Sequence, residues 1–162
     1  YALKQLIEQS KRVVIMGHMH PDMDCFGAAL GIHRVCIMCD RPAYILINEV
    51  TESLMDIYRQ AKESEKYQFI NSKKAESITD KDTLVVLVDT HRPSYAEHGV
   101  LLSMTDRIVI IIDVQRMQWK IRLFLILSLT HHQQQNLWQK CFSILLQRKH
   151  CLSWKQRHFL QE

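Results

Sequence analysis

The sequence predicts an α/β domain over residues 1–113 of the 162, with a mostly parallel sheet and helices on both faces. Three observations lead to this fold class. Continuous apolar runs occur that are typical of strands buried on both faces. Segments with a helical spacing of apolar residues separate these runs, and such alternation indicates parallel pairing through crossover connections. Polar residues with the chemistry of metal ligands directly follow several runs, at the sheet edge where such folds place their sites.

The strands are predicted from runs of Val, Ile and Leu. Four runs are strong and one is short, and the domain is expected to be truncated after the fourth strong strand. The strong runs are Arg12–Met16, Ala43–Ile47, Thr83–Val88 and Arg107–Ile112, and the short one is Gln68–Ile70.

The helices are predicted from apolar residues three and four positions apart. They are Ala2–Gln9, Ala28–Met38, Glu52–Ala61, Lys73–Ile78 and a part of Ser94–Met104. The polar stretch His18–Asp24 is expected to be a loop, with His20 near its rim. His33 is expected to be exposed on its helix, and the acidic residues of Glu52–Glu65 to form a solvated helix face.

Charge is divided unevenly along the chain. Residues 1–113 hold 13 Lys and Arg against 16 Asp and Glu, a net charge of −3, whereas residues 114–162 hold 8 against 1, a net charge of +7. The basic character therefore belongs to the last part and does not predict nucleic-acid binding by the first, so no duplex nucleic acid is expected as a partner. No apolar run reaches the length of a membrane span, and no membrane contact by this segment is expected.

The cysteines predict no disulfide framework. There are five, an odd number, at positions Cys25, Cys36, Cys39, Cys141 and Cys151, and no secretory signal opens the chain. The spacing of Cys36 and Cys39 would suit redox or zinc chemistry, but both lie in an apolar helical run without a second pair at zinc spacing. We therefore expect buried, reduced thiols in a cytoplasmic protein.

Candidate metal ligands follow three of the strong strands. His18 comes after the first strand, and Asp89 and Asp113 come at the ends of the strands that begin at Thr83 and Arg107. Because the carboxyl ends of parallel strands share one edge of the sheet, these side chains are expected to converge.

The loop after the first strand carries the densest set of candidates. His18, Asp22 and Asp24 place one imidazole and two carboxylates within seven residues, and Pro21 stiffens the turn. Such mixed ligands suit manganese, and Asp22 and Asp24 can serve two adjacent ions. Two ions about 3.5–4 Å apart can activate a hydroxide and stabilise the attacking and leaving oxygens of an in-line displacement at phosphorus. The alternative is that Asp22 or Asp24 only caps the next helix. The aspartates at the other strand ends favour the metal site.

These residues resemble the motifs of the DHH superfamily of metallophosphoesterases. Residues Gly17 to Gly31 are similar to its first motif, GHxxPDxDxxGAxxG. The stretch Val88-Asp89-Thr90-His91-Arg92-Pro93-Ser94 is similar to its second motif, in the form found in bacterial cyclic di-AMP phosphodiesterases. Val109 to Asp113 resembles the strand that leads into the third motif. The resemblance covers residues 1–113. It implies a cytoplasmic phosphodiesterase domain whose intact parent is anchored in a membrane.

The resemblance also implies roles for single residues. His18 and Asp22 would bind one manganese ion, Asp24 would bind the other, and Asp89 would bridge both. Asp113 would be the first residue of the DHH motif and would orient a ligand without binding the metal itself. His91 could contact a phosphate of the substrate.

The family pattern stops after Asp113. Two histidines are expected there, and the chain has Val114-Gln115-Arg116 instead. Residues 114–162 contain no Gly, Pro, Ala or Asp but nine Gln and all three Trp, and the apolar run Leu123–Leu129 has no evident partner. The segment is therefore expected to form no confident domain. The alternative is a basic helix that binds nucleic acid or lipid.

A change of reading frame would explain the altered composition. Codons compatible with residues 127–137 spell EPYASSAAEL in a shifted frame, which resembles the family segment EPYASSTAELV. A short insertion after the Asp113 codon can likewise restore DHHRPADA. We therefore expect the tail to be out of frame and the domain to be interrupted.

The sequence thus predicts a fragment of a manganese-dependent enzyme that hydrolyses a cyclic dinucleotide, most consistently cyclic di-AMP, by two-metal hydroxide attack. This chain itself is expected to be inactive, and the intact protein could form a homodimer. Two alternatives share the metal site, namely a phosphodiesterase or phosphatase of short oligonucleotides and nucleotides, and a manganese pyrophosphatase. A third is a non-functional product of a disrupted gene.

Overall fold

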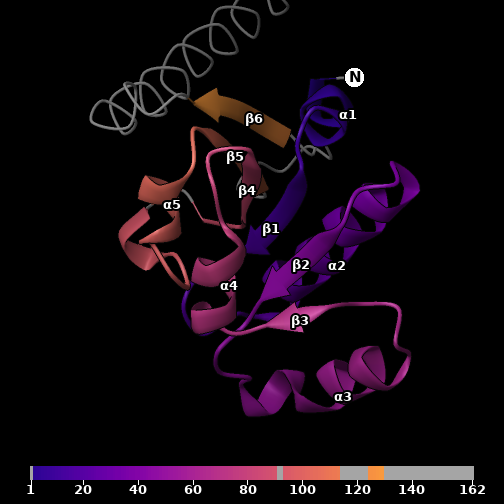
Figure 1. Ribbon diagram of the computed structural model, residues 1–162. Coiled ribbons are helices and arrows are strands. Elements are labelled where there is room, and N and C mark those ends of the chain that lie inside the picture. Colours follow the sequence, from indigo (N-terminus) through magenta and orange to yellow (C-terminus); the bar gives the residue numbers. More distant parts are fainter. Residues whose placement is uncertain (1, 91–92, 114–123, 130–162) are drawn as a thin grey trace, which may run out of the picture. The chain divides into compact units, whose positions relative to one another are not determined.

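The computed structural model describes residues 2–90, 93–113 and 124–129, which belong to one unit, Tyr1–His131. The strands are β1 (Arg12–Met16), β2 (Ala43–Leu46), β3 (Phe69–Ile70), β4 (Thr83–Val88), β5 (Arg107–Asp113) and β6 (Phe124–Leu129) (Figure 1). The α-helices are α1 (Ala2–Glu8), α2 (Met23–Met38), α3 (Met55–Glu63), α4 (Ser72–Ile78) and α5 (Leu101–Met104), and the 3-10 turns are η1 (Glu52–Leu54) and η2 (Pro93–Tyr95).

The sheet has the order β3-β2-β1-β4-β5-β6, and its first five strands are parallel. The strand order therefore reverses between β1 and β4. The chain first adds β2 and β3 on one side of β1, and it then adds β4, β5 and β6 on the other side. In the register of this pair, Met16 lies opposite Leu87. The point where strand order reverses is where open α/β sheets form their ligand crevice.

Both faces of the sheet are buried. One face packs against α1 and α2 through a cluster that includes Ile7, Ala29, Val13, Val86 and Val109. The other face of the sheet lies on the side of α4 and α5 (Figure 1). The alternate side chains of the same strands, which point to this face, are buried too and include Val14, Val85, Leu87 and Ile110. The predicted fold class, a mostly parallel sheet with helices on both faces, is confirmed. None of the described helices is long and apolar enough to cross a membrane.

Two predictions about the elements need correction. Helix α2 begins at Met23 and not at Ala28, because the Asp22 side chain accepts a hydrogen bond from the Cys25 N–H (2.9 Å) and caps the helix there. The sheet also does not stop at the fourth strong strand. Residues 124–129 pair antiparallel with β5, from Asp113 opposite Phe124 to Ile108 opposite Leu129. An apolar segment pairs readily with such an edge, because an open edge presents unpaired N–H and C=O groups.

His33 is the third correction, since it is buried and not exposed. Only 1% of its surface is accessible, and its ring lies 5.3 Å from that of Tyr67. Its Nε2 atom accepts a hydrogen bond from the Gln68 N–H (3.4 Å). The segment that leads into β3 therefore covers this face of α2, and burial lowers the pKa of His33. The acidic side chains of residues 52–65 are exposed, as predicted.

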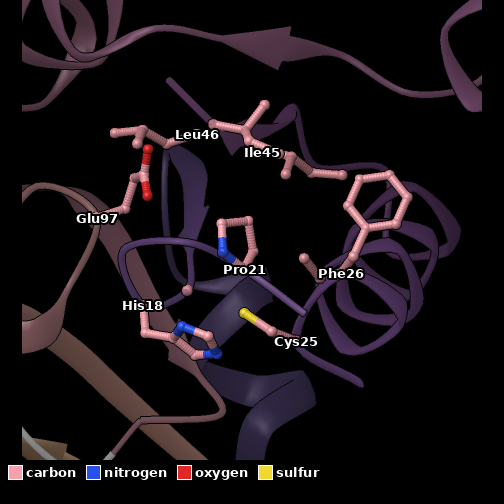
Figure 2. Close-up of a pocket in the computed structure, with 10 residues that line it drawn as sticks. His18, Pro21, Cys25, Phe26, Ile45, Leu46 and Glu97 are labelled. Carbon is pink, nitrogen blue, oxygen red and sulfur yellow. The ribbon is translucent and has the colours of Figure 1, made fainter. Parts of the chain in front are cut away.

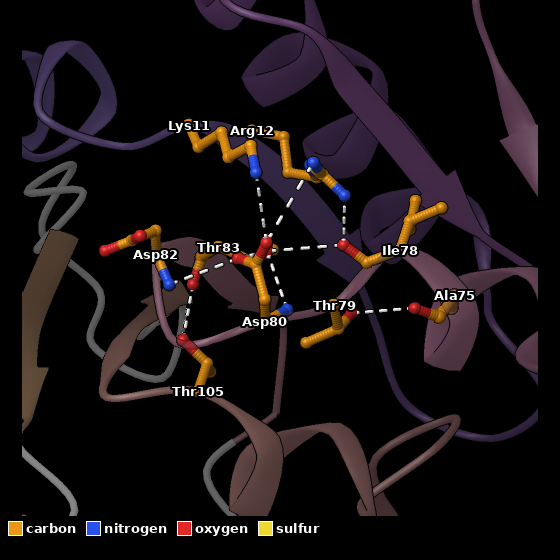
Figure 3. A network of polar contacts seen from close by, with 9 residues as sticks. All are labelled: Lys11, Arg12, Ala75, Ile78, Thr79, Asp80, Asp82, Thr83 and Thr105. Atoms are coloured by element: carbon orange, nitrogen blue, oxygen red, sulfur yellow. Dashed lines mark hydrogen bonds and ion pairs between the residues drawn. The ribbon is translucent and has the colours of Figure 1, made fainter.

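A polar network closes the amino edge of β1 and β4 (Figure 3). Asp80 lies at its centre and accepts hydrogen bonds from the Thr83 hydroxyl (2.7 Å) and the Asp82 N–H (3.1 Å). The same carboxylate pairs with Lys11 (3.6 Å) and Arg12 (3.9 Å). The Thr83 hydrogen bond, followed by the two cations, holds the pKa of Asp80 below its ordinary value of 3.8.

We predict that Asp80→Asn lowers the free energy of unfolding at pH 7 by less than about 1 kcal/mol, since the pair is partly exposed. A carboxyl whose pKa is depressed by folding stabilises the protein above its ordinary pKa, and this contribution disappears as the pH falls through the lower folded value. The difference between the two proteins should therefore become smaller as the pH is lowered. Urea unfolding at pH 7 and pH 3 measures it.

The control is Asp106→Asn, because Asp106 is exposed and has no hydrogen bond or ion pair with the described residues. It should leave the stability unchanged at both pH values. An Asp80→Asn deficit of equal size at pH 7 and pH 3 would contradict the assignment of this stabilisation to the charged carboxylate.

Candidate metal site

His18 and Asp89 leave neighbouring strands at the same level of the sheet. His18 follows β1 by two residues and Asp89 follows β4 directly. Since Met16 pairs with Leu87, two further steps along each strand reach this histidine and this aspartate. Their Nε2 and Oδ2 atoms are 3.8 Å apart. The site therefore lies at the reversal of strand order, where the fold offers a crevice.

The orientation of the His18 ring can be read from its hydrogen bond. Its Nδ1 atom lies 2.9 Å from the C=O of Met19. A carbonyl only accepts, so Nδ1 must carry the proton in this contact. The Nε2 atom then faces two carboxylates, Asp89 at 3.8 Å and Asp22 Oδ1 at 4.0 Å. In metalloproteins, a ligating histidine holds its ring in the same way, donating its other N–H to a backbone carbonyl.

The two aspartates of the first loop have different positions. Asp22 is the N-cap of α2, so its Oδ1 atom both caps the helix and lies near His18. Asp24 lies within the first helical turn, is exposed, and makes no hydrogen bond or ion pair with the described residues. The structure thus places His18 next to Asp22 and next to Asp89, while Asp24 stands one helical step away.

Asp89 has an unusual backbone conformation. Its φ is 54°, in the left-handed region, and its N–H donates to the C=O of Ile111 (3.0 Å), continuing the pairing of β4 with β5. Aspartate and asparagine tolerate this region better than other residues with a side chain. The chain therefore turns sharply at this residue, and a strained backbone at a polar crevice is typical of a functional site.

Cys25 is a residue of this site that the sequence did not single out. Its Sγ atom, the His18 ring and an Asp89 oxygen lie within 4.8 Å of one another. Figure 2 shows the thiol beside the His18 ring, with Glu97 across a small pocket from both. Burial, and then the carboxylates of Asp89, Asp22 and Glu97, raise the pKa of Cys25 to about 12. A thiol with this pKa carries no charge at neutral pH, and it packs against the end of β1.

Gly17 is required by this packing. A Cβ atom at position 17 would lie 2.1 Å from Cys25 Sγ, which is much closer than any van der Waals contact. Cys25 is 2% exposed, so its sulfur has little room to move away. The absence of a side chain at Gly17 therefore lets α2 approach the end of β1 and brings Asp22 toward His18.

Glu97 and Asn48 are further residues of the carboxyl edge that were not singled out. Residues 17–19 form a short antiparallel bridge with residues 95–97, in which His18 lies opposite Ala96. The Glu97 carboxylate accepts a hydrogen bond from the Asn48 N–H (2.8 Å). Asn48 is a polar residue just after a strong strand, which is the same signal that identified His18 and Asp89.

The other predicted residues lie away from the cluster or have side chains that the structure does not describe. His20 is an exposed loop residue with a φ of 58°. Among the three described cysteines, Cys36 is buried, Cys39 ends α2 half-buried, and all are free thiols. His91, the tail at 114–123 and 130–162, Cys141 and Cys151 lie outside the described residues. Asp113 is placed by its backbone at the carboxyl end of β5.

The donor set suits a hard or borderline divalent cation. Separations of 3.8 and 4.0 Å are too long for hydrogen bonds. They still allow one ion to contact His18 together with either carboxylate, because two ligands that are each about 2.1 Å from an ion lie at most about 4.2 Å apart. One imidazole with two carboxylates is a set that manganese accepts.

Comparison with protein families matches residues 12–122 to the DHH family, N-terminal domain. Among curated proteins, the chain is 37% identical over 115 residues to a cyclic-di-AMP phosphodiesterase, GdpP, of Bacillus subtilis (strain 168). It is 40% identical over 116 residues to the cyclic-di-AMP phosphodiesterase PdeA of Listeria monocytogenes serotype 1/2a (strain 10403S). It is 36% identical over 116 residues to the GdpP of Geobacillus thermodenitrificans (strain NG80-2). Each match covers 68% of this chain but only 17–18% of the relative.

We predict that Gly17→Ala lowers the free energy of unfolding by about 1–3 kcal/mol, because the added methyl overlaps the Cys25 sulfur. The double variant Gly17→Ala/Cys25→Ala should recover part of that loss relative to the sum of the single changes, since the smaller side chain makes room. A double-mutant cycle by urea unfolding measures this coupling.

Gly27→Ala is the matched control. Nothing lies within 4 Å of a Cβ at position 27, so alanine there should be neutral or should stabilise α2 by up to about 1 kcal/mol. Strict additivity of Gly17→Ala and Cys25→Ala would contradict the proposed close packing.

Proposed function

Because this chain belongs to the DHH family through its N-terminal domain, we propose that it forms a manganese centre for phosphodiester hydrolysis. His18, Asp22 and Asp89 would hold one ion, and Asp89 together with Asp24 would supply ligands to a second. The reaction proposed for the intact protein is hydrolysis of a cyclic dinucleotide such as cyclic di-AMP. The chain spans less than a fifth of the length of the curated relatives it matches.

The observation that carries this proposal is the direction of the His18 ring. With the proton on Nδ1, the lone pair of Nε2 points toward two carboxylates, and all three groups are electron donors. Without a cation or an added proton, such an arrangement is repulsive. A divalent ion between them would convert the repulsion into coordination, and the Met19 carbonyl would keep the ring in place.

The second ion would be held less well in this chain. Asp24 lies on α2 outside the His18 cluster, and the position where the family has the first histidine after Asp113 is Val114. When bound, the metal pair would supply the charge that activates water and stabilises the leaving oxygen. The residues of this chain would orient that pair: Met19 through the His18 ring, and Cys25 through the Asp22 loop.

The relatives favour a cyclic dinucleotide among the substrates that a DHH-type centre could take. Three relatives, at 36–40% identity, are named as cyclic-di-AMP phosphodiesterases. The metal ligands alone do not distinguish this substrate from a linear dinucleotide or from pyrophosphate. The proposed substrate therefore rests on the relatives, and the proposed metal-dependent hydrolysis rests on His18, Asp22 and Asp89.

We predict that the chain binds Mn²⁺ and that Asp89→Asn weakens the binding by more than about 10–100-fold, the loss typical of residues outside the direct ligand set. Asparagine suits the left-handed backbone at this position, so the fold should be kept. Electron paramagnetic resonance of free Mn²⁺ during a titration measures the dissociation constant.

Asp106→Asn removes the same charge at the opposite edge of β5 and should leave the affinity for Mn²⁺ unchanged. Equal affinity in the wild-type chain, Asp89→Asn and Asp106→Asn would show that any binding is a general effect of surface charge. That result, or no binding by the wild-type chain, would contradict the proposed metal centre.

We further predict that this chain hydrolyses cyclic di-AMP with Mn²⁺ much more slowly than a version carrying the family's two histidines after Asp113 and its downstream domain. Loss of a direct ligand should cost more than the about 10–100-fold typical of supporting residues. Chromatography of the products from cyclic di-AMP, a linear dinucleotide and pyrophosphate also separates the three substrate classes.

Comparable turnover by the two versions would contradict the need for that histidine and domain. The DNA sequence around the Asp113 codon tests the proposed change of reading frame independently. An uninterrupted frame that encodes Val114-Gln115-Arg116 in several independent isolates would exclude it.

A further inference from the structure

Glu97 joins residues 17–22, which carry His18 and Asp22 and are called the metal-binding loop below, to the rest of the carboxyl edge. Its backbone N–H donates to the C=O of Gly17 (2.9 Å), and the Met19 N–H donates to the C=O of Tyr95 (2.8 Å). These two hydrogen bonds enclose His18, which lies opposite Ala96. The segment that contains Glu97 is therefore the direct support of the loop that presents the His18 ring.

The Glu97 side chain fixes this support to the neighbouring strand. Its Oε1 atom accepts a hydrogen bond from the Asn48 N–H (2.8 Å), just beyond the end of β2. The Asn48 side chain in turn accepts from the Ser72 N–H (2.9 Å) at the start of α4. One series of hydrogen bonds thus links the segments that follow β1, β2, β3 and β4.

The residue after Glu97 strengthens the same attachment. His98 Nε2 lies 2.6 Å from Glu76 Oε1 on α4, and the His98 side chain is 22% exposed. The bridge to residues 17–19 is therefore held on its outer side by two neighbouring residues. Glu97 is the only one of the two that also bonds to the metal-binding loop through its own backbone.

We infer that Glu97 is a positioning residue, which holds the His18 imidazole against Asp22 and Asp89 by fixing the 95–97 segment to the end of β2. This inference rests on the proposed metal centre. A metal ligand misplaced by about 1 Å loses much of its effect, so the support of the ring matters as well as the ring itself. The role needs an oxygen that reaches the Asn48 N–H, and it does not need the negative charge.

Three substitutions of Glu97 in the full 162-residue chain distinguish the effect of its side-chain length from the effect of its negative charge. Glu97→Gln keeps the reach and the acceptor oxygen, Glu97→Asp keeps the charge but shortens the reach, and Glu97→Ala removes both. The matched control is Glu49→Ala, because Glu49 neighbours Asn48, is exposed, and makes no hydrogen bond or ion pair with the described residues.

Electron paramagnetic resonance gives the Mn²⁺ dissociation constant of each variant. We expect Glu97→Gln and Glu49→Ala to remain within about 2-fold of the wild-type chain, and Glu97→Asp and Glu97→Ala to bind about 10–100-fold more weakly. Wild-type affinity in Glu97→Asp with weak binding by Glu97→Gln would show that charge is what counts, and would overturn the inference. Equal affinity in all variants would overturn it as well.

Amide hydrogen exchange supplies a second measurement that does not depend on the metal. The protection of the Met19 N–H should fall about 2–10-fold in Glu97→Asp and stay unchanged in Glu97→Gln. If Glu97→Ala does not fold, this pair of variants still decides the question. A wild-type chain that binds no Mn²⁺ would overturn the proposed metal centre, whereas equal Met19 protection in the two variants would overturn the positioning role.

Discussion

The parallel pairing of β1 with β4 is the constraint on which the candidate site depends. It joins the β3-β2-β1 half of the sheet to the β4-β5-β6 half, at the point where the strand order reverses. The connection that follows β1 carries His18 and the connection that follows β4 begins with Asp89, so both residues lie where open α/β sheets place their ligands. A shift of β4 by one residue would turn Asp89 to the opposite face of the sheet.

Close packing at Gly17 and an unfavourable backbone conformation at Asp89 bring the candidate ligands near one another. A Cβ atom at position 17 would lie 2.1 Å from the Cys25 sulfur, so only glycine fits there. Asp89 adopts a left-handed φ of 54°. Asp22 meanwhile uses one carboxylate oxygen to begin α2. These features are coupled, since the cap on Asp22 sets where Cys25 lies and Cys25 sets how closely α2 can approach β1. Strain and close packing of this kind are tolerated where the surrounding sheet is rigid.

The two edges of the central strands differ in how their charges are satisfied. At the amino edge, Asp80 faces Lys11 and Arg12 and accepts hydrogen bonds, so its negative charge is balanced within the protein. At the carboxyl edge, Asp22 and Asp89 face the Nε2 atom of His18 at distances too long for hydrogen bonds. The first arrangement stabilises the fold as it stands, whereas the second is the observation that supports the proposal of a bound cation.

The sequence by itself determined the strong strands and the candidate ligands at their ends, because a strand buried on both faces must be continuously apolar and the polar residue that follows it stands out. It did not determine the burial of His33, which Tyr67 and Gln68 cover, or the role of Glu97, whose partner Asn48 is 49 positions away. It also gave no sign that residues 124–129 would pair with β5. The local pattern of apolar and polar residues indicates whether a segment is a helix or a strand and which of its faces are buried. Which segments become neighbours depends on strand order and register, and these are decided only when the whole sheet assembles.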